Sequence, residues 1–157
     1  SLGQGLSIAV GLALAARLDG KKHKIFCIMG DGEQQEGQIW EAAMEAGHYG
    51  LDNLIGIVDV NRLQIDGWVK DVMNIDPLAE KYSAFGWNVI EIDGHDMEAI
   101  LEGLARARHA DGRPTVLIAH TVKGKGVSFM ENKIKYHGAA TTNEEYEQAL
   151  RELEVKS

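Results

Sequence analysis

The sequence has a single cysteine, no long apolar run and more acidic than basic side chains. A lone cysteine, Cys27, excludes an internal disulfide and favours a reducing, cytoplasmic setting, where it acts as a small buried hydrophobe. The longest apolar segments, such as LIGIVDV, are far shorter than the roughly 20 residues that span a bilayer, and no signal-peptide pattern opens the chain. A formal charge of −8 argues against a nucleic-acid-binding face.

Short runs of branched apolar residues predict four strands that are buried on both faces. They are KIFCIMG (24–30), LIGIVDV (54–60), WNVIEID (87–93) and TVLIAHTV (115–122). Helical patterns occupy 1–18, 36–48, 76–85, 96–110 and 141–157. Alternation of strand and helix predicts an α/β fold, with a mostly parallel sheet flanked by helices and right-handed crossovers. At 157 residues and 45% hydrophobic content, we expect one domain over 1–157.

Three of the predicted helices begin with recognisable capping residues. Asp76 followed by Pro77 is one start, Asp96 is a second, and Thr142 with Asn143 is the third. None of these helices carries a pattern that suggests chemistry. We therefore look for function at the ends of the strands.

Polar side chains follow the predicted strands, and the stretch GDG at 30–32 is the first of them. Asp-Gly is a common turn pair, so Asp31 alone is weak evidence for a site. Asn61, however, follows the next strand about thirty residues later, which is one step of a strand–helix–strand unit. Adjacent parallel strands end at the same edge, where ligands bind in open α/β sheets. A carboxylate and an amide oxygen suit Mg²⁺, which commonly bridges protein carboxylates to phosphate. The pairing therefore favours a metal–diphosphate site over a plain turn.

A GDG followed about thirty residues later by Asn resembles the fingerprint of thiamine-diphosphate enzymes. The surrounding segments resemble transketolase in particular: SLGQGLSIAVGLALA, GDGEQQEGQIWEAA, LDNLIGIVDVNRLQIDG, GWNVIEIDGHD and AHTVKGKGVSFMENKIKYHGA. The resemblance covers nearly the whole chain. It is to the diphosphate-binding (PP) domain, especially the version encoded as a separate subunit. It implies a PP-domain-like fold that lacks its N-terminal part, because the chain starts partway through the expected domain.

The resemblance implies a specific set of metal and diphosphate ligands. Asp31, the side chain of Asn61 and the backbone carbonyl of Leu63 would bind magnesium. The N–H of Gly32 would meet the diphosphate. Asp31 and Asn61 are the two ligands that the residue pattern had already suggested.

Four further residues match family positions around the cofactor. Leu2 and Ile65 match apolar residues that flank the cofactor rings. Glu36 matches an acidic residue of a network that links two cofactor sites across subunits. His137 matches a histidine that approaches the diphosphate and assists proton transfer, a role that suits a side chain titrating near neutrality. We therefore expect His137 and Glu36 to take part in catalysis.

Other residues near the strand ends have simpler explanations. We expect structural roles for His95 and His120. The segment TVKGKG lacks the spacing of a nucleotide-binding loop, so Lys123 and Lys125 are expected in a loop that shapes the wall of the site. The three tryptophans, Trp40, Trp68 and Trp87, are expected to pack in the core or at an interface.

Transketolase-like chemistry transfers a two-carbon ketol unit between sugar phosphates, as in the pentose phosphate pathway, with thiamine diphosphate and Mg²⁺ as cofactors. The family supplies the remaining groups from a pyrimidine-binding domain, so we expect activity only with such a domain or subunit, in a homodimer or heterotetramer, and with the missing N-terminal section. No nucleic-acid or membrane partner is expected. Three alternatives stay open: a 1-deoxyxylulose-5-phosphate synthase-like enzyme, a dehydrogenase E1-like enzyme, and a non-catalytic cofactor-binding subunit.

Overall fold

Four parallel strands form the sheet on which the functional residues are placed. The computed structural model describes residues 2–154, so the predicted extensions of the first helix to Ser1 and of the last helix over 155–157 lie outside it. In spatial order the strands are β1 (Ile25–Gly30), β2 (Leu54–Val60), β6 (Thr115–His120) and β5 (Asn88–Asp93). Every neighbouring pair in this order is parallel. The predicted fold class, a parallel sheet flanked by helices, is confirmed.

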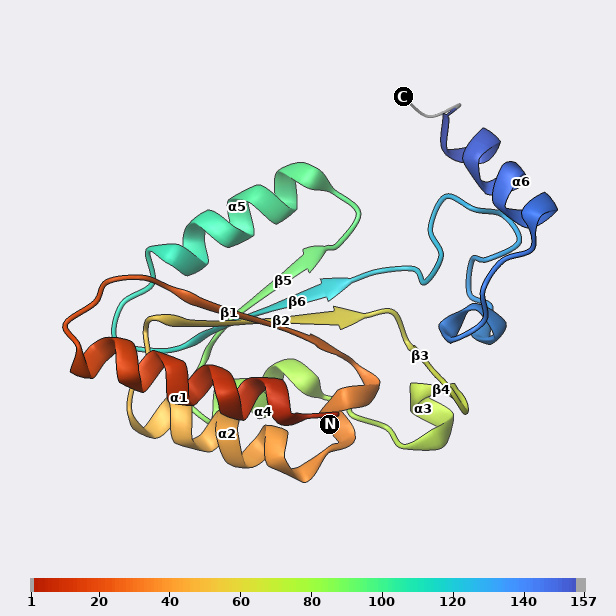
Figure 1. Cartoon of the computed structure of the whole chain (residues 1–157). Helices are drawn as coiled ribbons and strands as arrows, with labels where there is room; N and C mark the ends of the chain where they lie inside the picture. Colours follow the sequence, from red (N-terminus) through yellow and green to blue (C-terminus); the bar gives the residue numbers. More distant parts are fainter. Residues whose placement is uncertain (1, 155–157) are drawn as a thin grey trace.

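Helices cover the two faces of the sheet unequally (Figure 1). One face carries α1 (Gln4–Leu18), α2 (Gly37–His48) and α4 (Leu78–Ala84), and the other carries α5 (Met97–Arg108). Shorter elements are η1 (Gly32–Gln35), β3 (Leu63–Gln64), β4 (Gly67–Trp68), α3 (Val69–Val72) and η2 (Ile134–His137). The last element among the described residues is α6 (Asn143–Glu154), which projects beside the sheet (Figure 1). None of the helices among residues 2–154 has the length and apolar character needed to cross a membrane.

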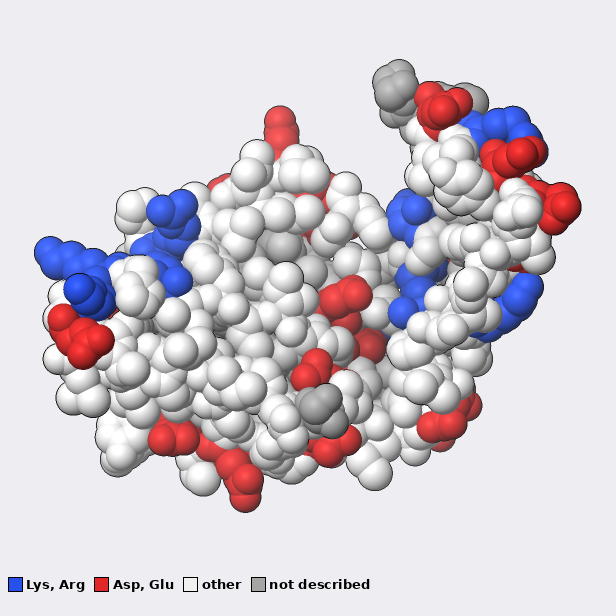
Figure 2. Space-filling view, in the orientation of Figure 1, with Lys and Arg blue, Asp and Glu red and all other residues white. Residues whose placement is uncertain are grey.

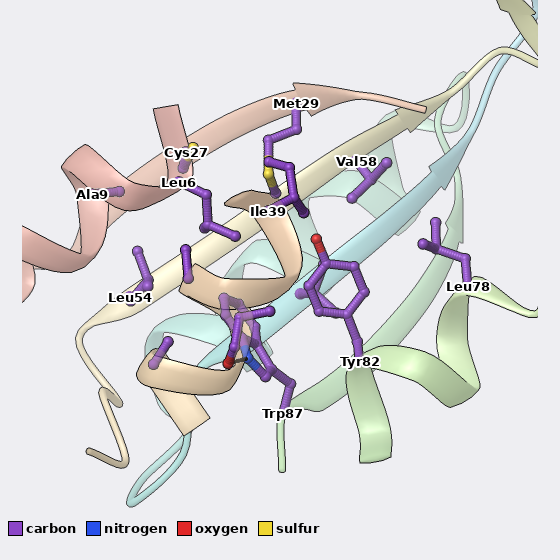
Figure 3. Packing of buried hydrophobic residues seen from close by; sticks show 14 of the residues in the cluster. Leu6, Ala9, Cys27, Met29, Ile39, Leu54, Val58, Leu78, Tyr82 and Trp87 are labelled. Carbon is purple, nitrogen blue, oxygen red and sulfur yellow. Dashed lines mark hydrogen bonds between the residues drawn. The ribbon is translucent and has the colours of Figure 1, made fainter. Parts of the chain in front are cut away.

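The main core lies between the sheet and helices α1, α2 and α4 (Figure 3). Each large apolar side chain that is fully buried there stabilises the fold by about 1.5–3 kcal/mol. Two polar side-chain groups in this core have partners: the Tyr82 hydroxyl donates to Gln34 Oε1 at 2.7 Å, and Trp87 Nε1 donates to the Ala43 carbonyl at 2.8 Å. These bonds tie η1 and α2 to the segment around α4. Trp87 is thus a core residue as predicted, whereas Trp68 is exposed on β4.

Burial on both faces, predicted for all four strands, holds for the central strands β2 and β6 but is wrong for the edge strands β1 and β5, since Ile90 is the one buried residue of β5. Side chains of β1 alternate, with Cys27 and Met29 buried and with Phe26 and Ile28 46% and 73% exposed. The cause is that α5 packs on β5 and β6 and leaves the β1 end of that face uncovered.

The helix starts agree with the sequence in part. Asp96 caps α5 as predicted, accepting bonds from the Glu98 and Ala99 N–H groups. Asp76 does not cap α4, which begins at Leu78 after Pro77. Its carboxylate instead pairs with Arg62 at 2.9 Å, so a tertiary contact has replaced the local one. The helix predicted from Glu36 begins one residue later, with Glu36 as its N-cap and the separate turn η1 before it.

Candidate functional site

A cavity of about 380 Å³ opens at the carboxyl ends of β1 and β2. Its walls come from the start of the chain, the β1–α2 connection, the β2–β3 connection and η2. The lining residues are Leu2, Gly30, Asp31, Gly32, Glu33, Gln35, Glu36, Asn61, Leu63, Gln64, Ile65, Asp66 and His137. All eight residues that the sequence and the resemblance nominated are among them.

Asp31 lies at the end of β1 and is 1% exposed. Its backbone N–H donates to the Asp59 carbonyl at 3.1 Å, which continues the pairing of β1 with β2. Its carboxylate accepts two backbone bonds, from Gly32 N at 2.8 Å and from Arg62 N at 2.5 Å. Burial raises the pKa of the Asp31 carboxyl, those two bonds oppose the rise, and the Asp59 charge adds to it. Burial therefore disfavours the ionised carboxylate more than its two hydrogen bonds favour it, and a nearby cation would favour the ionised form.

Asn61 lies just past β2, in a turn that wraps around Asp31. Its side-chain oxygen accepts the Leu63 N–H at 3.1 Å, and its amide nitrogen donates to Asp59 Oδ2 at 3.1 Å. Between Asn61 and Leu63, Arg62 has φ +67°, a conformation that is unusual for a residue with a Cβ. This backbone directs the Arg62 N–H at the Asp31 carboxylate. The structure thus confirms that Asp31 and Asn61 meet at one edge of the sheet.

The donors around this turn match one class of metal. The donors predicted here are all oxygens: the Asp31 carboxylate, the Asn61 side-chain amide and the Leu63 backbone carbonyl. Among residues 2–154 no group of three His, Cys, Asp or Glu side chains lies close enough to hold a metal ion. The zinc-type donor sets of histidine and thiolate are therefore absent from the described chain. Hard oxygen donors beside a buried carboxylate fit Mg²⁺, which keeps several ligands from water or phosphate.

Two apolar side chains lie at the mouth of the cavity. Leu2 and Ile65 are 58% and 68% exposed, and both line the cavity. At Gly32 an added Cβ would lie 3.1 Å from the Gln64 Cβ, so a side chain there would crowd the facing wall. The cavity therefore offers both apolar contacts and a close approach to backbone.

Glu33 is a site residue that sequence reasoning did not identify. Its two carboxylate oxygens accept the Gly3 N–H at 2.9 Å and the Gly30 N–H at 3.0 Å. Gly3 precedes α1 with φ +82°. Glu33 therefore fastens the start of α1 to the end of β1. Its place next to GDG was the only signal, and an acidic residue in a first helical turn is common on any surface.

Charged side chains face each other across a hollow at this edge. Figure 2 shows acidic side chains on the sheet side of the hollow and basic side chains on the facing side of the C-terminal segment. Lys125 Nζ, in the segment TVKGKG, lies 3.9 Å from Glu131 Oε1. Neither Lys123 nor Lys125 lines the cavity, so the prediction that their loop shapes its wall is wrong.

The histidines separate into two groups. His137, in η2, is exposed and lines the cavity, because η2 lies against β3. His95 Nε2 accepts the Val122 N–H at 2.8 Å, and His120 Nε2 lies 2.9 Å from Glu91 Oε2. Both therefore have partners outside the cavity, in keeping with the structural roles predicted for them.

Comparisons with known proteins place these observations in a family. The family model described as "Transketolase, thiamine diphosphate binding domain" matches residues 1–156. The chain is 47% identical over 153 residues to an apulose-4-phosphate transketolase subunit from Phocaeicola vulgatus, covering 98% of this chain and 54% of that protein. It is 47% identical over 154 residues to the 6-deoxy-6-sulfo-D-fructose transketolase subunit SqwG of a Clostridium species, covering 98% and 56%. A crystal structure of transketolase from Campylobacter jejuni matches with a TM-score of 0.90 and 38% identity, over 96% of this chain and 24% of that one. The chain thus spans about half the length of the curated relatives named here.

Proposed function

This chain belongs to the transketolase family, through the thiamine diphosphate-binding domain, and we propose that it supplies the magnesium–diphosphate half of a site for ketol transfer between sugar phosphates. The observation that carries the proposal is that Asp31 and Asn61 lie at the carboxyl ends of two neighbouring parallel strands and line one cavity. Family membership supports thiamine diphosphate as the cofactor. The oxygen donor set supports Mg²⁺.

Each of the eight cavity residues predicted above has a defined task under this proposal. Asp31, the Asn61 side chain and the Leu63 carbonyl hold Mg²⁺, and the Gly32 N–H meets the diphosphate. Because that N–H donates to Asp31 Oδ1 in this structure, it must turn or be shared when the diphosphate binds. When bound, the cofactor supplies the reactive carbon and the electron sink.

The remaining tasks fall to the walls of the cavity. Leu2 and Ile65 flank the cofactor rings and exclude water from them. His137 moves a proton at its imidazole near the reacting carbon, which its exposed place on the wall permits. Glu36, at the start of α2, joins an acidic network with a second subunit.

A pyrimidine-binding domain or subunit completes the site in the assembly that we propose, either a homodimer or a heterotetramer in the cytoplasm. Two relatives are named as subunits of transketolases, which supports a divided enzyme. The buried, free Cys27 is compatible with a reducing compartment. Comparing a ketose phosphate with pyruvate as the donor separates ketol transfer from the chemistry of other thiamine-diphosphate enzymes.

Asp31→Asn tests the metal site directly. We expect Mg²⁺-dependent affinity for thiamine diphosphate, measured by calorimetry, to fall at least about tenfold, which corresponds to about 1.4 kcal/mol. Asp66→Asn is the matched control, because Asp66 is an exposed carboxylate that lines the same cavity. The circular dichroism spectrum of both variants should stay unchanged. Equal affinities for wild type and Asp31→Asn would refute the metal assignment.

A further inference from the structure

The Asn61 side chain is held between a group that only accepts and a group that only donates. Its Nδ2 donates to the Asp59 carboxylate, and its Oδ1 accepts from the Leu63 backbone N–H, each at 3.1 Å. A reversed amide would face oxygen with oxygen and N–H with N–H. These two partners therefore select one orientation of the amide.

Asp59 is itself held from a different strand. Its Oδ1 accepts a short hydrogen bond from the hydroxyl of Thr121, the first residue after β6. The Thr121 backbone N–H also donates to the Val60 carbonyl at 3.1 Å. With one oxygen bound to Thr121, the other oxygen of the carboxylate stays directed at Asn61. The orientation of the amide thus depends on a contact between residues 62 positions apart in sequence.

We propose that Asp59 and Thr121 form an orienting pair that fixes the amide oxygen of Asn61, rather than its NH₂ group, for the cation. Neither residue of the pair lines the cavity, whereas Asn61 does, so the pair acts through Asn61 as positioning residues. The inference rests on the proposed function, because it requires Asn61 to be a metal ligand. A flipped amide would turn its positive hydrogens towards the cation and remove a ligand.

An electrostatic role for Asp59 is the competing explanation, since its negative charge near the site would also favour a cation. Asp59→Asn separates the two roles. An asparagine at 59 keeps an oxygen to accept from Asn61, and its NH₂ group donates to the Thr121 hydroxyl, which also accepts. The orienting contacts therefore survive in this variant while the charge is lost. Asp59→Leu removes both.

The experiment measures Mn²⁺ affinity by electron paramagnetic resonance, with thiamine diphosphate present, in the complete enzyme that contains this chain. The variants are Asp59→Asn, Asp59→Leu, Thr121→Val and Thr121→Ser. We expect Asp59→Leu and Thr121→Val to weaken Mn²⁺ binding by about 10-fold to 100-fold, as loss of a supporting contact behind a metal ligand does. Asp59→Asn and Thr121→Ser should stay within about threefold of wild type, because both retain the hydrogen bonds.

Several outcomes would overturn the inference. Equal losses for Asp59→Asn and Asp59→Leu would assign the effect to charge. Equal losses for Thr121→Ser and Thr121→Val would assign it to something other than the hydroxyl. If Asp59→Leu fails to fold, judged by circular dichroism, the two Thr121 variants decide. Asp31→Asn is measured alongside: if it weakens Mn²⁺ binding while Thr121→Val does not, the proposed function stands and the orienting pair is wrong. If Asp31→Asn has no effect, both fail.

Discussion

Gly47 lies in the last turn of α2, directly against the segment that follows α4. A Cβ added there would lie 1.8 Å from the Phe85 carbonyl oxygen and 3.1 Å from its carbonyl carbon. Favourable contact needs about 3.5 Å or more. The Phe85 atoms that would clash belong to the backbone, which is held in place because the Phe85 N–H donates to the Lys81 carbonyl at 3.2 Å. The clash in Gly47→Ala therefore cannot be relieved by a side-chain rotation, and α2 must move away from α4.

The expected loss of stability follows from two opposing terms. Overpacking with a backbone shift costs about 1–3 kcal/mol, and a clash with immobile backbone belongs at the upper end. Alanine recovers about 1 kcal/mol of helix propensity relative to glycine. The free energy of unfolding should therefore fall by about 2 kcal/mol. For a domain of this size, that corresponds to a Tm about 4–8 °C lower.

Gly11→Ala is the matched control, because Gly11 lies within helix α1 and an added Cβ there meets no atom within 4 Å. This variant gains helix propensity without a clash, so its Tm should rise by about 1–4 °C. Thermal unfolding followed by circular dichroism at 222 nm compares the two variants with wild type. If both substitutions raise the Tm, the close packing of α2 against the end of α4 is not real.

Two further predictions concern the β2–β3 turn and the C-terminal helix. Arg62→Gly should be about 1 kcal/mol more stable in urea unfolding than Arg62→Ala, because both lose the exposed ion pair with Asp76 but only glycine relieves the positive φ; equal midpoints would contradict the strain at Arg62. The Glu145 pKa is lowered to about 2, chiefly by the Thr142 N–H and then by the Tyr136 hydroxyl and the Lys135 ammonium group. These contacts therefore stabilise the fold above pH 4.5, and their contribution is lost as the pH falls from 4.5 towards 2. Amide protection factors in α6, which divide out the intrinsic pH dependence of exchange, should fall over that range, and Glu145→Gln should weaken that fall; an unchanged pH profile of protection in that variant would assign the effect elsewhere.

The elements of this fold were predictable because their signals are local. Apolar runs identified all four strands of the parallel sheet, and the strand–helix alternation predicted that they run parallel, but not their spatial order. From the residues alone, the carboxyl-edge rule brought Asp31 and Asn61 together. The other cavity residues came only through the resemblance to transketolase, since nothing in the pattern around Leu2 or His137 indicates a site.

What the sequence did not reveal depends on contacts between distant segments. Thr121 reaches Asp59 across 62 residues, and Glu33 reaches back 30 residues to Gly3. The capping prediction for Asp76 was wrong because Arg62 competes for its carboxylate. No local preference indicates which partner a polar side chain takes when a tertiary partner is close. The positive φ of Arg62 likewise arises from the turn that surrounds Asp31.

The uncovered β1 end of one sheet face affects the solubility of this protein at a place distant in function from the cavity. β1 is one of the two edge strands, and its Phe26 and Ile28 side chains are exposed to solvent. An outer strand with apolar side chains is a template for pairing between copies, so precipitation during purification would begin at β1. Neither side chain lines the cavity. A charged replacement such as Ile28→Lys would therefore be the first change to make when preparing concentrated samples, because it lies outside the cavity.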